Sequence, residues 1–392
     1  MVSPNNQSST TNFDAFGQST SSSVKGALAS DTAVTGTVSK SFCNSCETLF
    51  PDAYIKVVTS SVTGAEQQQF IDKYGREVGS KTKLPVSGAY SVSRKTYDNQ
   101  GRPSQVFEPH IGSVSSYVST VSYDALGRAT QTTMANGGVS KVDYSGYTTT
   151  NTDALLKTKS SQSNYLGQTV STTDHKGSVL SFSYNAYGDL LTASFAGVTR
   201  VSNSYDAYGR KYAMTDLDKG SWSYVTNGFG ELISQTNAKA QTTVFEYNNA
   251  GQMIRRYDPS GTVCWSYGST AASYNVNQLM GMKQWTASNT ACDSTVTPAY
   301  SESYLYNSKA LVSSKTISTG GASYTTSSTY DSYGRPYELT YPSSGSIIGP
   351  KIRTDYSFGA AYKTTDYSSG SAGTVYHLTT AVNARGQSTG VT

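Results

Sequence analysis

The sequence predicts an all-β protein in which antiparallel hairpins repeat along the chain and stack into one long coiled sheet. Three observations predict it. A short turn phrase recurs at fixed spacing, β-branched and aromatic residues fill the segments between turns, and no segment shows a sustained apolar pattern of helical period. The 31 tyrosines and 35 glycines among 392 residues suit strands and turns and suit helices badly.

The repeated phrase contains a tyrosine, an aspartate or asparagine, a glycine and often an arginine. The residues expected to form structural turns are Tyr97, Asp98, Gly101 and Arg102; Tyr123, Asp124, Gly127 and Arg128; Gly188; Tyr205, Asp206, Gly209 and Arg210; Tyr247 and Gly251; and Tyr330, Asp331, Gly334 and Arg335. From Gly146 to Gly251, six glycines follow one another at intervals of 21 residues. Chance does not produce such spacing, so the chain contains an internal repeat.

Each phrase predicts a tight turn. An Asp or Asn side chain accepts hydrogen bonds from the backbone two residues on, and the glycine supplies the positive φ that a type I turn with a bulge needs. Asp153, Asp174, Asp216 and Asp258 fall on a second ladder with the same period, so each repeat holds two turns and two strands. One hairpin alone is marginally stable, and stacking is therefore expected. The arginine after the glycine is expected to lie over a tyrosine ring or to pair with the turn aspartate.

Composition shifts divide the chain into two parts. Residues 1–50, rich in Ser, Thr and Asn, are expected to form a flexible leader or a cap. Residues 51–392 are expected to form the repeat sheet, with an irregular insertion at 262–303. This insertion interrupts the period and holds Trp265 and Trp285.

The four cysteines form two pairs in the sequence. Cys43 and Cys46 have the spacing of half a zinc site, of a redox pair or of a local disulfide. A zinc site needs a second ligand pair and a redox motif needs a βαβ context, and because the sequence offers neither nearby, the disulfide is favoured. Cys264 and Cys292 bracket the irregular insertion and are expected to close it as a second disulfide. Both pairings fit an oxidising compartment.

Charge and hydropathy exclude several classes of protein. Charged residues make up 14% of the chain and the net charge is +4, which leaves no basic patch for nucleic acid. The many aromatic residues argue against disorder. No apolar run approaches the ~18 residues of a transmembrane segment. No secretory signal is visible at the start, so we expect either export by another route or origin in a longer polypeptide.

The Tyr-Asp-x-x-Gly-Arg phrase at this spacing resembles the RHS/YD-repeat family. That family includes Rhs polymorphic toxins, the C component of Tc toxins, wall-associated proteins and teneurins. The resemblance covers about residues 70–387. It implies a partial or complete hollow β-shell, a secreted or cell-surface location, and either a toxin or effector cargo or further shell segments as partners. The family's end-of-shell region, with aspartates credited with self-cleavage, is not recognisable in this sequence.

These features are compatible with three functions. The favoured one is a non-enzymatic scaffold that encapsulates or presents a toxin or effector domain. The alternative is a surface module that binds a carbohydrate or a receptor through aromatic side chains, with Trp265 and Trp285 as the candidates.

An enzyme is the least favoured of the three functions. The sequence has no nucleophile elbow, metalloprotease helix or phosphate loop, and its three histidines are scattered. Each turn carries about one carboxylate, too few for a calcium site. We therefore predict no catalytic residue, metal or cofactor.

Overall fold

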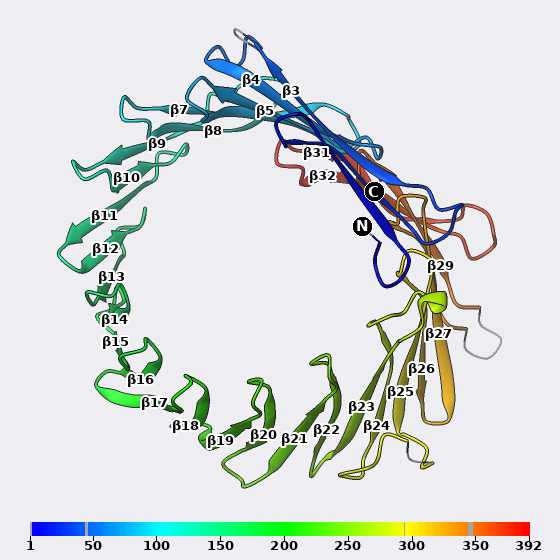
Figure 1. The fold of residues 1–392 in the computed structure, drawn as a ribbon. Helices are drawn as coiled ribbons and strands as arrows, with labels where there is room; N and C mark the ends of the chain where they lie inside the picture. Colours follow the sequence, from blue (N-terminus) through cyan, green and yellow to red (C-terminus); the bar gives the residue numbers. More distant parts are fainter. Residues whose placement is uncertain (1, 44–45, 294, 344–347) are drawn as a thin grey trace. The chain divides into compact units, whose positions relative to one another are not determined.

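The computed structural model describes residues 2–43, 46–293, 295–343 and 348–392. Over these residues the chain is a succession of short strands (Figure 1). The first sixteen are β1 (Ser8–Phe13), β2 (Ser19–Lys25), β3 (Val34–Phe42), β4 (Ala53–Ser61), β5 (Glu66–Asp72), β6 (Glu77–Lys83), β7 (Tyr90–Tyr97), β8 (Pro103–Ile111), β9 (Val118–Tyr123), β10 (Ala129–Thr133), β11 (Val139–Ser145), β12 (Thr148–Thr152), β13 (Thr158–Ser163), β14 (Thr169–Thr173), β15 (Val179–Tyr184) and β16 (Leu190–Phe195).

The remaining strands are β17 (Val198–Tyr205), β18 (Lys211–Asp216), β19 (Gly220–Thr226), β20 (Leu232–Thr236), β21 (Thr242–Tyr247), β22 (Met253–Asp258), β23 (Gly261–Tyr267), β24 (Leu279–Trp285), β25 (Tyr300–Tyr306), β26 (Val312–Thr319), β27 (Ala322–Tyr330), β28 (Pro336–Thr340), β29 (Lys351–Ser357), β30 (Ala360–Asp366), β31 (Val375–Val382) and β32 (Ser388–Val391). A single 3-10 turn, η1 (Ala271–Ser273), is the only helical segment in the described part of the chain.

The strands belong to one sheet of 32 strands in which consecutive strands pair antiparallel. The predicted fold class, all-β with repeated antiparallel hairpins in a long sheet, is therefore confirmed. The repeats from β13 to β22 show the unit most plainly, because each contains two strands of five to eight residues and two tight turns.

A bulge precedes the phrase turn in each of these hairpins. In β17 and β18, Ser204 faces Ala213 but Tyr205 faces Lys211, so the pairing register shifts between Ser204 and Tyr205. The neighbouring hairpins shift at the equivalent position. A bulge of this kind is what a type I turn ending in a left-handed residue produces. The turn residues therefore fix the register of every hairpin.

The chain divides into two compact units. Unit 1 consists of residues 1–120, 266–281 and 301–392, and unit 2 of residues 121–265 and 282–300. Unit 1 holds a compact apolar core beneath β4 to β7, formed by Phe50, Phe70 and Val92 with smaller neighbours. The rings of Phe50 and Phe70 stack with centroids 4.2 Å apart. Gly79 is required there, because an added Cβ would overlap the Phe50 ring.

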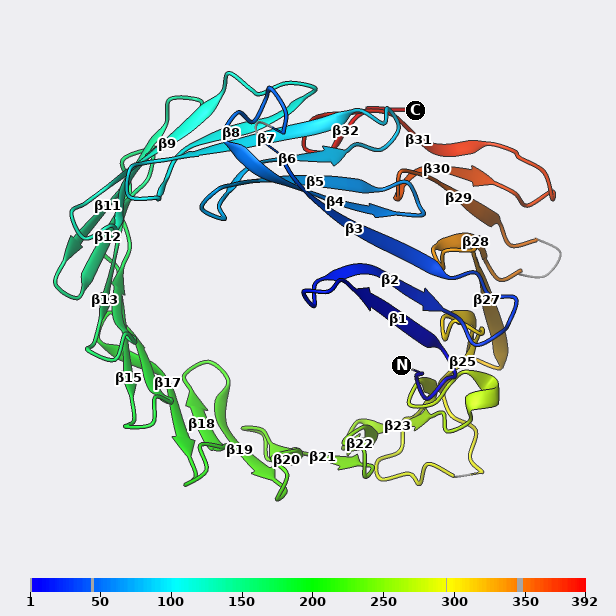
Figure 2. The ribbon, with the colours of Figure 1, turned by 45° about the horizontal axis from the view of Figure 1, so that its top comes forward.

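Unit 1 also joins the N-terminal strands to segments that come much later in the sequence. Residues 1–50, expected as a leader or cap, carry β1 to β3, and β3 pairs with β4 (Figure 2). The Ala27 backbone N–H donates to the Ser308 carbonyl at 2.9 Å, and the Ser308 hydroxyl donates to Asp31 at 3.0 Å. The amide oxygen of Asn5 accepts from the Val276 N–H at 2.7 Å. The N-terminal strands are thus hydrogen-bonded to segments more than two hundred residues away in the sequence.

Unit 2 is a sheet with little buried surface. Among its described residues, the buried ones are Gly261, Thr262, Cys264 and Trp285, all in or beside the predicted insertion. The strands from β10 to β22 are half-buried or exposed along their whole length. Their stability therefore rests on backbone ladders and cross-strand pairs rather than on a packed core.

Candidate functional sites: the repeat turns and the disulfide loop

The phrase turn is built around one carboxylate. Oδ1 of Asp206 accepts the backbone N–H groups of Tyr208 and Arg210, each at 2.9 Å. Its Oδ2 accepts Nε and Nη2 of the Arg210 guanidinium, each at 2.7 Å. Gly209 closes the turn at a φ of +77°. Both oxygens of the carboxylate are therefore satisfied within the turn, and the same Asp–Arg bond occurs in the turns at Asp72, Asp98, Asp124 and Asp331.

These contacts lower the pKa of the carboxyl groups of Asp72, Asp98, Asp124 and Asp206. The Arg210 N–H, followed by the Arg210 guanidinium and the Tyr208 N–H, holds the pKa of Asp206 below its ordinary value, although desolvation opposes the shift. At Asp72, which is buried, desolvation is the largest influence and acts to raise the pKa. Hydrogen bonds from Arg76 and Tyr74 outweigh it, so the pKa of Asp72 is also lowered. Carboxylates held in their charged form by saturated hydrogen bonds are poor proton acceptors at neutral pH.

A matched pair replaces the ion pair in several turns that begin with asparagine, although the turn at Asn307 has Leu311 four residues on. The Asn227 amide donates to Glu231 at 2.6 Å, and the Asn185 amide donates to Asp189 at 2.9 Å. Other turns pair Asn with Gln in the same way, at 164 and 168, at 248 and 252, and at 383 and 387. In the ion-paired turns Asp occurs with Arg four residues on, whereas in these asparagine turns an acceptor stands at that position. The sequence contains this pairing as a correlation between the first residue of the turn and the residue four positions later, but the pairing was not predicted.

The phrase tyrosine ties each repeat to the preceding one. Tyr205 donates its hydroxyl to the Leu190 carbonyl at 3.0 Å, two residues beyond the glycine of the preceding phrase turn. Tyr144, Tyr184 and Tyr247 make the same bond at the same sequence separation of 15 residues. Burial, with the nearby Asp189 carboxylate, raises the pKa of Tyr205. Each of these four repeats thus adds one side-chain hydrogen bond across the strands to the backbone ladder, whereas Ser163 and Thr226 stand at the tyrosine position of two others. The sequence analysis did not predict these bonds.

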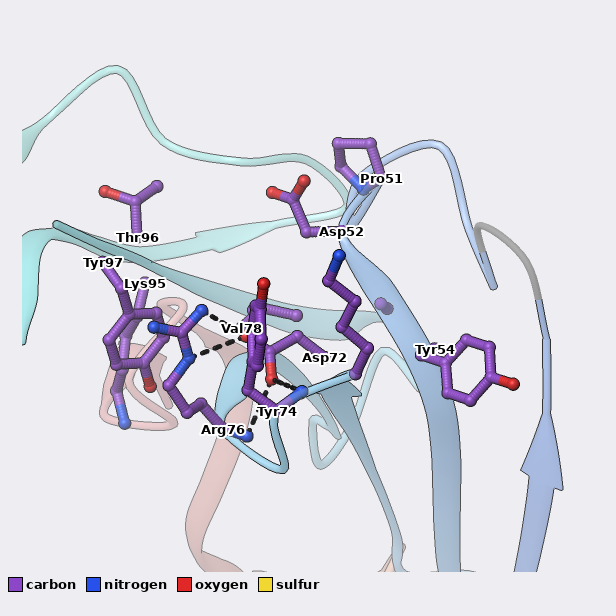
Figure 3. Close-up of a pocket in the computed structure, with 12 residues that line it drawn as sticks. Pro51, Asp52, Tyr54, Asp72, Tyr74, Arg76, Val78, Lys95, Thr96 and Tyr97 are labelled. Carbon is purple, nitrogen blue, oxygen red and sulfur yellow. Dashed lines mark hydrogen bonds and ion pairs between the residues drawn. The ribbon is translucent and has the colours of Figure 1, made fainter. Parts of the chain in front are cut away.

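Figure 3 shows a pocket beside such a turn, an open space of about 540 Å³ in unit 1. The Arg76 guanidinium lies between the carboxylate of Asp72 and the ring of Tyr97, 4.4 Å from the ring centroid. The Tyr97 hydroxyl donates to the Glu77 carbonyl at 2.7 Å. Both roles expected for the arginine, ion pair and ring contact, are present in this one side chain. The polar groups at the centre of the pocket are occupied by the turn itself, which favours a structural role for it.

The disulfide loop occupies part of the predicted insertion. Cys264 and Cys292 are bonded, with their Cα atoms 5.7 Å apart. The hydroxyl of the fully buried Thr262 donates to the Ala287 carbonyl at 3.0 Å and accepts the Thr290 N–H at 2.9 Å. The structure also places Cys43 and Cys46 in a bond, whereas residues 44 and 45 between them lie outside the described residues.

The two tryptophans proposed as ligand-binding aromatics do not form a shared surface. Trp285 is 2% exposed, and its indole N–H donates to the Val296 carbonyl at 2.8 Å. Its ring packs inside the loop, so it presents no face to a sugar. Trp265 is half-buried. The insertion therefore resembles a small local core, which a sequence cannot distinguish from an exposed aromatic patch.

The described residues contain no cluster of three or more His, Cys, Asp or Glu side chains arranged to hold a metal ion. The three histidines lie apart: His110 bonds Ser113 at 2.9 Å and His377 bonds Thr379 at 3.0 Å, while His175 lies in a turn of the second ladder. No helix in the described part of the chain is long and apolar enough to cross a membrane.

Comparison with known proteins defines the class. The family described as RHS Repeat matches residues 227–263, which include the Asn227 turn, β20, β21, β22 and the first three residues of β23. The structure of TcdB2–TccC3 matches with a TM-score of 0.73 at 14% identity, covering 98% of this chain and 24% of that one. The same complex without its hypervariable C-terminal region matches with a TM-score of 0.71 at 13% identity, covering 98% and 26%.

A Tc holotoxin pore from Photorhabdus luminescens matches with a TM-score of 0.67 at 14% identity, covering 91% of this chain and 20% of that one. No curated protein matches the chain significantly. The chain spans about a quarter of the length of the structures that it matches. The predicted resemblance to the RHS/YD-repeat family is therefore confirmed by the repeat match at residues 227–263, and the chain shares its fold with the matched part of the Tc-toxin structures.

Proposed function

We propose that the chain is a non-enzymatic wall segment of an RHS/YD-repeat shell that encloses or presents a toxin or effector domain. The observation that carries the proposal is the alignment of 98% of the chain with about a quarter of TcdB2–TccC3 at a TM-score of 0.73. A wall requires a rigid surface whose polar groups are satisfied internally, and the saturated turns and tyrosine bonds supply this. Further shell segments are the other partners that this role implies.

The turn chemistry supports a structural rather than a catalytic role. The turn aspartates are spread along the repeats, and the carboxylate of Asp206 is hydrogen-bonded within its own turn. A general acid and base require two carboxyl groups with different environments at one place. The proposal includes secretion or display at a cell surface. The two disulfides support this part of it, because such bonds persist in oxidising compartments. Thiol labelling of the unreduced protein in urea tests the disulfides: we expect no reaction, and four reactive thiols would contradict them.

Protease protection tests the encapsulating role. The chain is tagged at its native locus, purified with whatever copurifies, and treated with trypsin in buffer and in urea. We expect an effector domain that stays intact in buffer and is cleaved once the shell unfolds. As a control, the same domain is added free to the purified chain, where trypsin should degrade it. A preparation with no copurifying domain, or one whose domain is cleaved equally fast in buffer, would overturn the proposal.

A further inference from the structure

Four successive phrase turns of unit 2 carry a large, exposed apolar side chain at the position before the turn glycine. Tyr187, Tyr208 and Phe229 are 89%, 84% and 93% exposed, and Leu166 is 58% exposed. These four residues, which we call the turn-tip row, are 21 residues apart. Side chains this exposed add nothing to the packing of the sheet. A row of them marks an interaction surface.

The strand pairing places the turn-tip row along one edge of the sheet. The turns join β13 to β14, β15 to β16, β17 to β18 and β19 to β20, and in an antiparallel meander every second turn lies at the same edge. Successive tips are two strands apart, which is about 9 to 10 Å from the spacing of neighbouring strands. The row therefore presents an apolar side chain at a regular interval over four repeats.

The backbone of each tip is held in place by its own turn. The N–H of Tyr187 donates to Oδ1 of Asn185 at 3.0 Å, and the N–H of Tyr208 donates to Oδ1 of Asp206 at 2.9 Å. The other two tips make the same bond. A surface that is already ordered loses little conformational freedom when it binds, so the row is preorganised for a partner.

Two polar side chains lie at the base of the two middle tips. A Cβ at Gly188 would lie 3.2 Å from the amide nitrogen of Gln168, and one at Gly209 would lie 3.8 Å from Oδ2 of Asp189. Each polar side chain belongs to one turn and extends toward the glycine of the next turn. The middle tips thus carry an amide beside one ring and a carboxylate beside the other.

Each of these polar groups is only partly used by its own turn. Oε1 of Gln168 accepts from the Asn164 amide at 2.7 Å, and Oδ2 of Asp189 accepts from the Asn185 amide at 2.9 Å. Nothing in the described part of the chain bonds the amide nitrogen of Gln168 or Oδ1 of Asp189. The edge therefore offers one unpaired donor and, one tip further on, one unpaired acceptor.

The interval of the row limits the partner that can contact all of it. Such a partner must present apolar groups at the same interval of two strands, and the row itself is a surface of this kind. A two-fold axis between Tyr187 and Tyr208 brings the four tips of one copy against the four tips of another in reverse order. No other two-fold register pairs all four tips. The same arrangement brings the unpaired amide of Gln168 to the unpaired oxygen of Asp189 in the other copy, at two equivalent places.

We propose that the turn-tip row is a self-association surface on which a second copy of this chain docks through its own row. If each tip buries about 150 Å², the pair buries about 1,200 Å², which is the lower limit for a specific interface. We therefore expect a reversible dimer with a dissociation constant on the order of micromolar. The proposal does not depend on the enclosing role, because it concerns only residues of unit 2.

Sedimentation velocity of the purified chain at about 1 to 100 μM tests the proposal. We expect the sedimentation coefficient of the wild type to rise with concentration toward that of a dimer. Tyr187→Ser and Tyr208→Ser should each raise the dissociation constant about tenfold or more, because each removes a buried ring twice in the dimer. Leu217→Ser is the matched control and should associate like the wild type, since Leu217 is 58% exposed at the turn between β18 and β19, on the opposite edge.

A pair of polar substitutions tests the contact between the two copies. Gln168→Glu should weaken the dimer, because two carboxylates then face each other across the interface. Adding Asp189→Asn should restore the association, because the donor and the acceptor have then exchanged places. Both variants keep the bonds within their own turns, since the new side chains still accept from Asn164 and Asn185. Urea midpoints show whether every variant folds, and this pair decides the question if the serine variants do not.

Cysteine cross-linking tests the register. Chains carrying Tyr187→Cys are mixed with chains carrying Tyr208→Cys and oxidised, and the native cysteines do not interfere because they are already paired. We expect disulfide-linked dimers in the mixture and few with either variant alone, because tips of the same kind lie too far apart.

Three results would overturn the proposal. They are a wild type that is monomeric at every concentration, association that Tyr187→Ser and Tyr208→Ser leave undiminished, and cross-linking that is as efficient in one cysteine variant alone as in the mixture. In the first case, protection of Tyr187 and Tyr208 from iodination by a copurifying protein would identify that protein as the occupant of the row.

Discussion

Gly209 closes a phrase turn at a φ of +77°, and replacing it isolates the cost of that backbone conformation. A Cβ added at Gly209 would meet Oδ2 of Asp189 at 3.8 Å, an ordinary contact, so Gly209→Ala introduces no overlap. The left-handed conformation costs a residue with a Cβ about 1–2 kcal/mol. Gly228, in the next phrase turn, has no positive φ and open space around its Cα, so Gly228→Ala is the matched control.

The two variants differ only in this strain. Both substitutions restrict the unfolded chain equally, which stabilises the fold by about 0.4–1 kcal/mol wherever alanine fits. We therefore expect Gly228→Ala to stabilise the protein and Gly209→Ala to destabilise it, with about 1–2 kcal/mol between them. Ala240 has a φ of +58°, and Ala240→Gly should relieve the same strain and stabilise the protein.

Urea unfolding followed by tryptophan fluorescence measures these differences. All three tryptophans lie in unit 2, as do the three substituted positions, so the fluorescence reports the unit that is perturbed. Equal urea midpoints for Gly209→Ala and Gly228→Ala would refute the assignment of the turn conformation. A higher midpoint for Gly209→Ala than for the control would refute it more strongly.

Three further predictions follow from the turn contacts. Tyr205→Phe removes the hydroxyl bond between repeats and should lower the free energy of unfolding, measured in urea, by about 0.5–1.5 kcal/mol. Tyr208 is exposed at the tip of a turn, so Tyr208→Phe should leave the free energy of unfolding unchanged. Equal effects of the two substitutions would contradict the role of the Tyr205 hydroxyl. Asp206→Asn should destabilise the turn, because the asparagine amide and the Arg210 guanidinium are both donors and would face each other. Adding Arg210→Glu should restore stability, because it copies the Asn–Glu pair of another turn. A double variant less stable than either single variant would exclude this pairing. The pKa of Asp206 is lower in the folded protein than in the unfolded chain, so its contribution to stability is present above about pH 4 and is lost as the pH falls through the folded-state pKa. The urea midpoint should therefore drop in acid. A midpoint that is unchanged down to about pH 2 would contradict the lowered pKa.

The hairpins were predictable because their determinants are local. Gly209 and its counterparts mark positions of positive φ, and the alternating segments between them mark strands, so the period alone places two strands and two turns in each repeat. The role of the aspartate at the start of a turn, such as Asp206, was also predictable, because its hydrogen-bond partners lie within four residues. Information of this kind does not depend on what lies elsewhere in the fold.

Features that depend on distant contacts were not predictable. The strands in residues 1–50 lack an apolar face, and polar Ser and Thr runs give no alternation from which a strand could be recognised. Trp285 was predicted to bind a ligand, but its ring is buried. Its burial depends on the bond to Val296 and on the closure of the loop, neither of which can be seen in the sequence. The hydroxyl bonds of Tyr184 and Tyr205 were not predictable, because they depend on the pairing register between neighbouring strands.

Amide hydrogen exchange read by mass spectrometry tests the central claim most directly, namely that each 21-residue repeat is one hairpin of a continuous antiparallel sheet. Between residues 146 and 251 we predict protection that rises in the strands, falls at the phrase turns and at the second turns, and recurs with the repeat period. The Tyr205→Phe variant should lose protection first in β16 and β17, which its hydroxyl bond joins. Protection without the 21-residue period, or uniformly fast exchange through these residues, would contradict the repeat sheet.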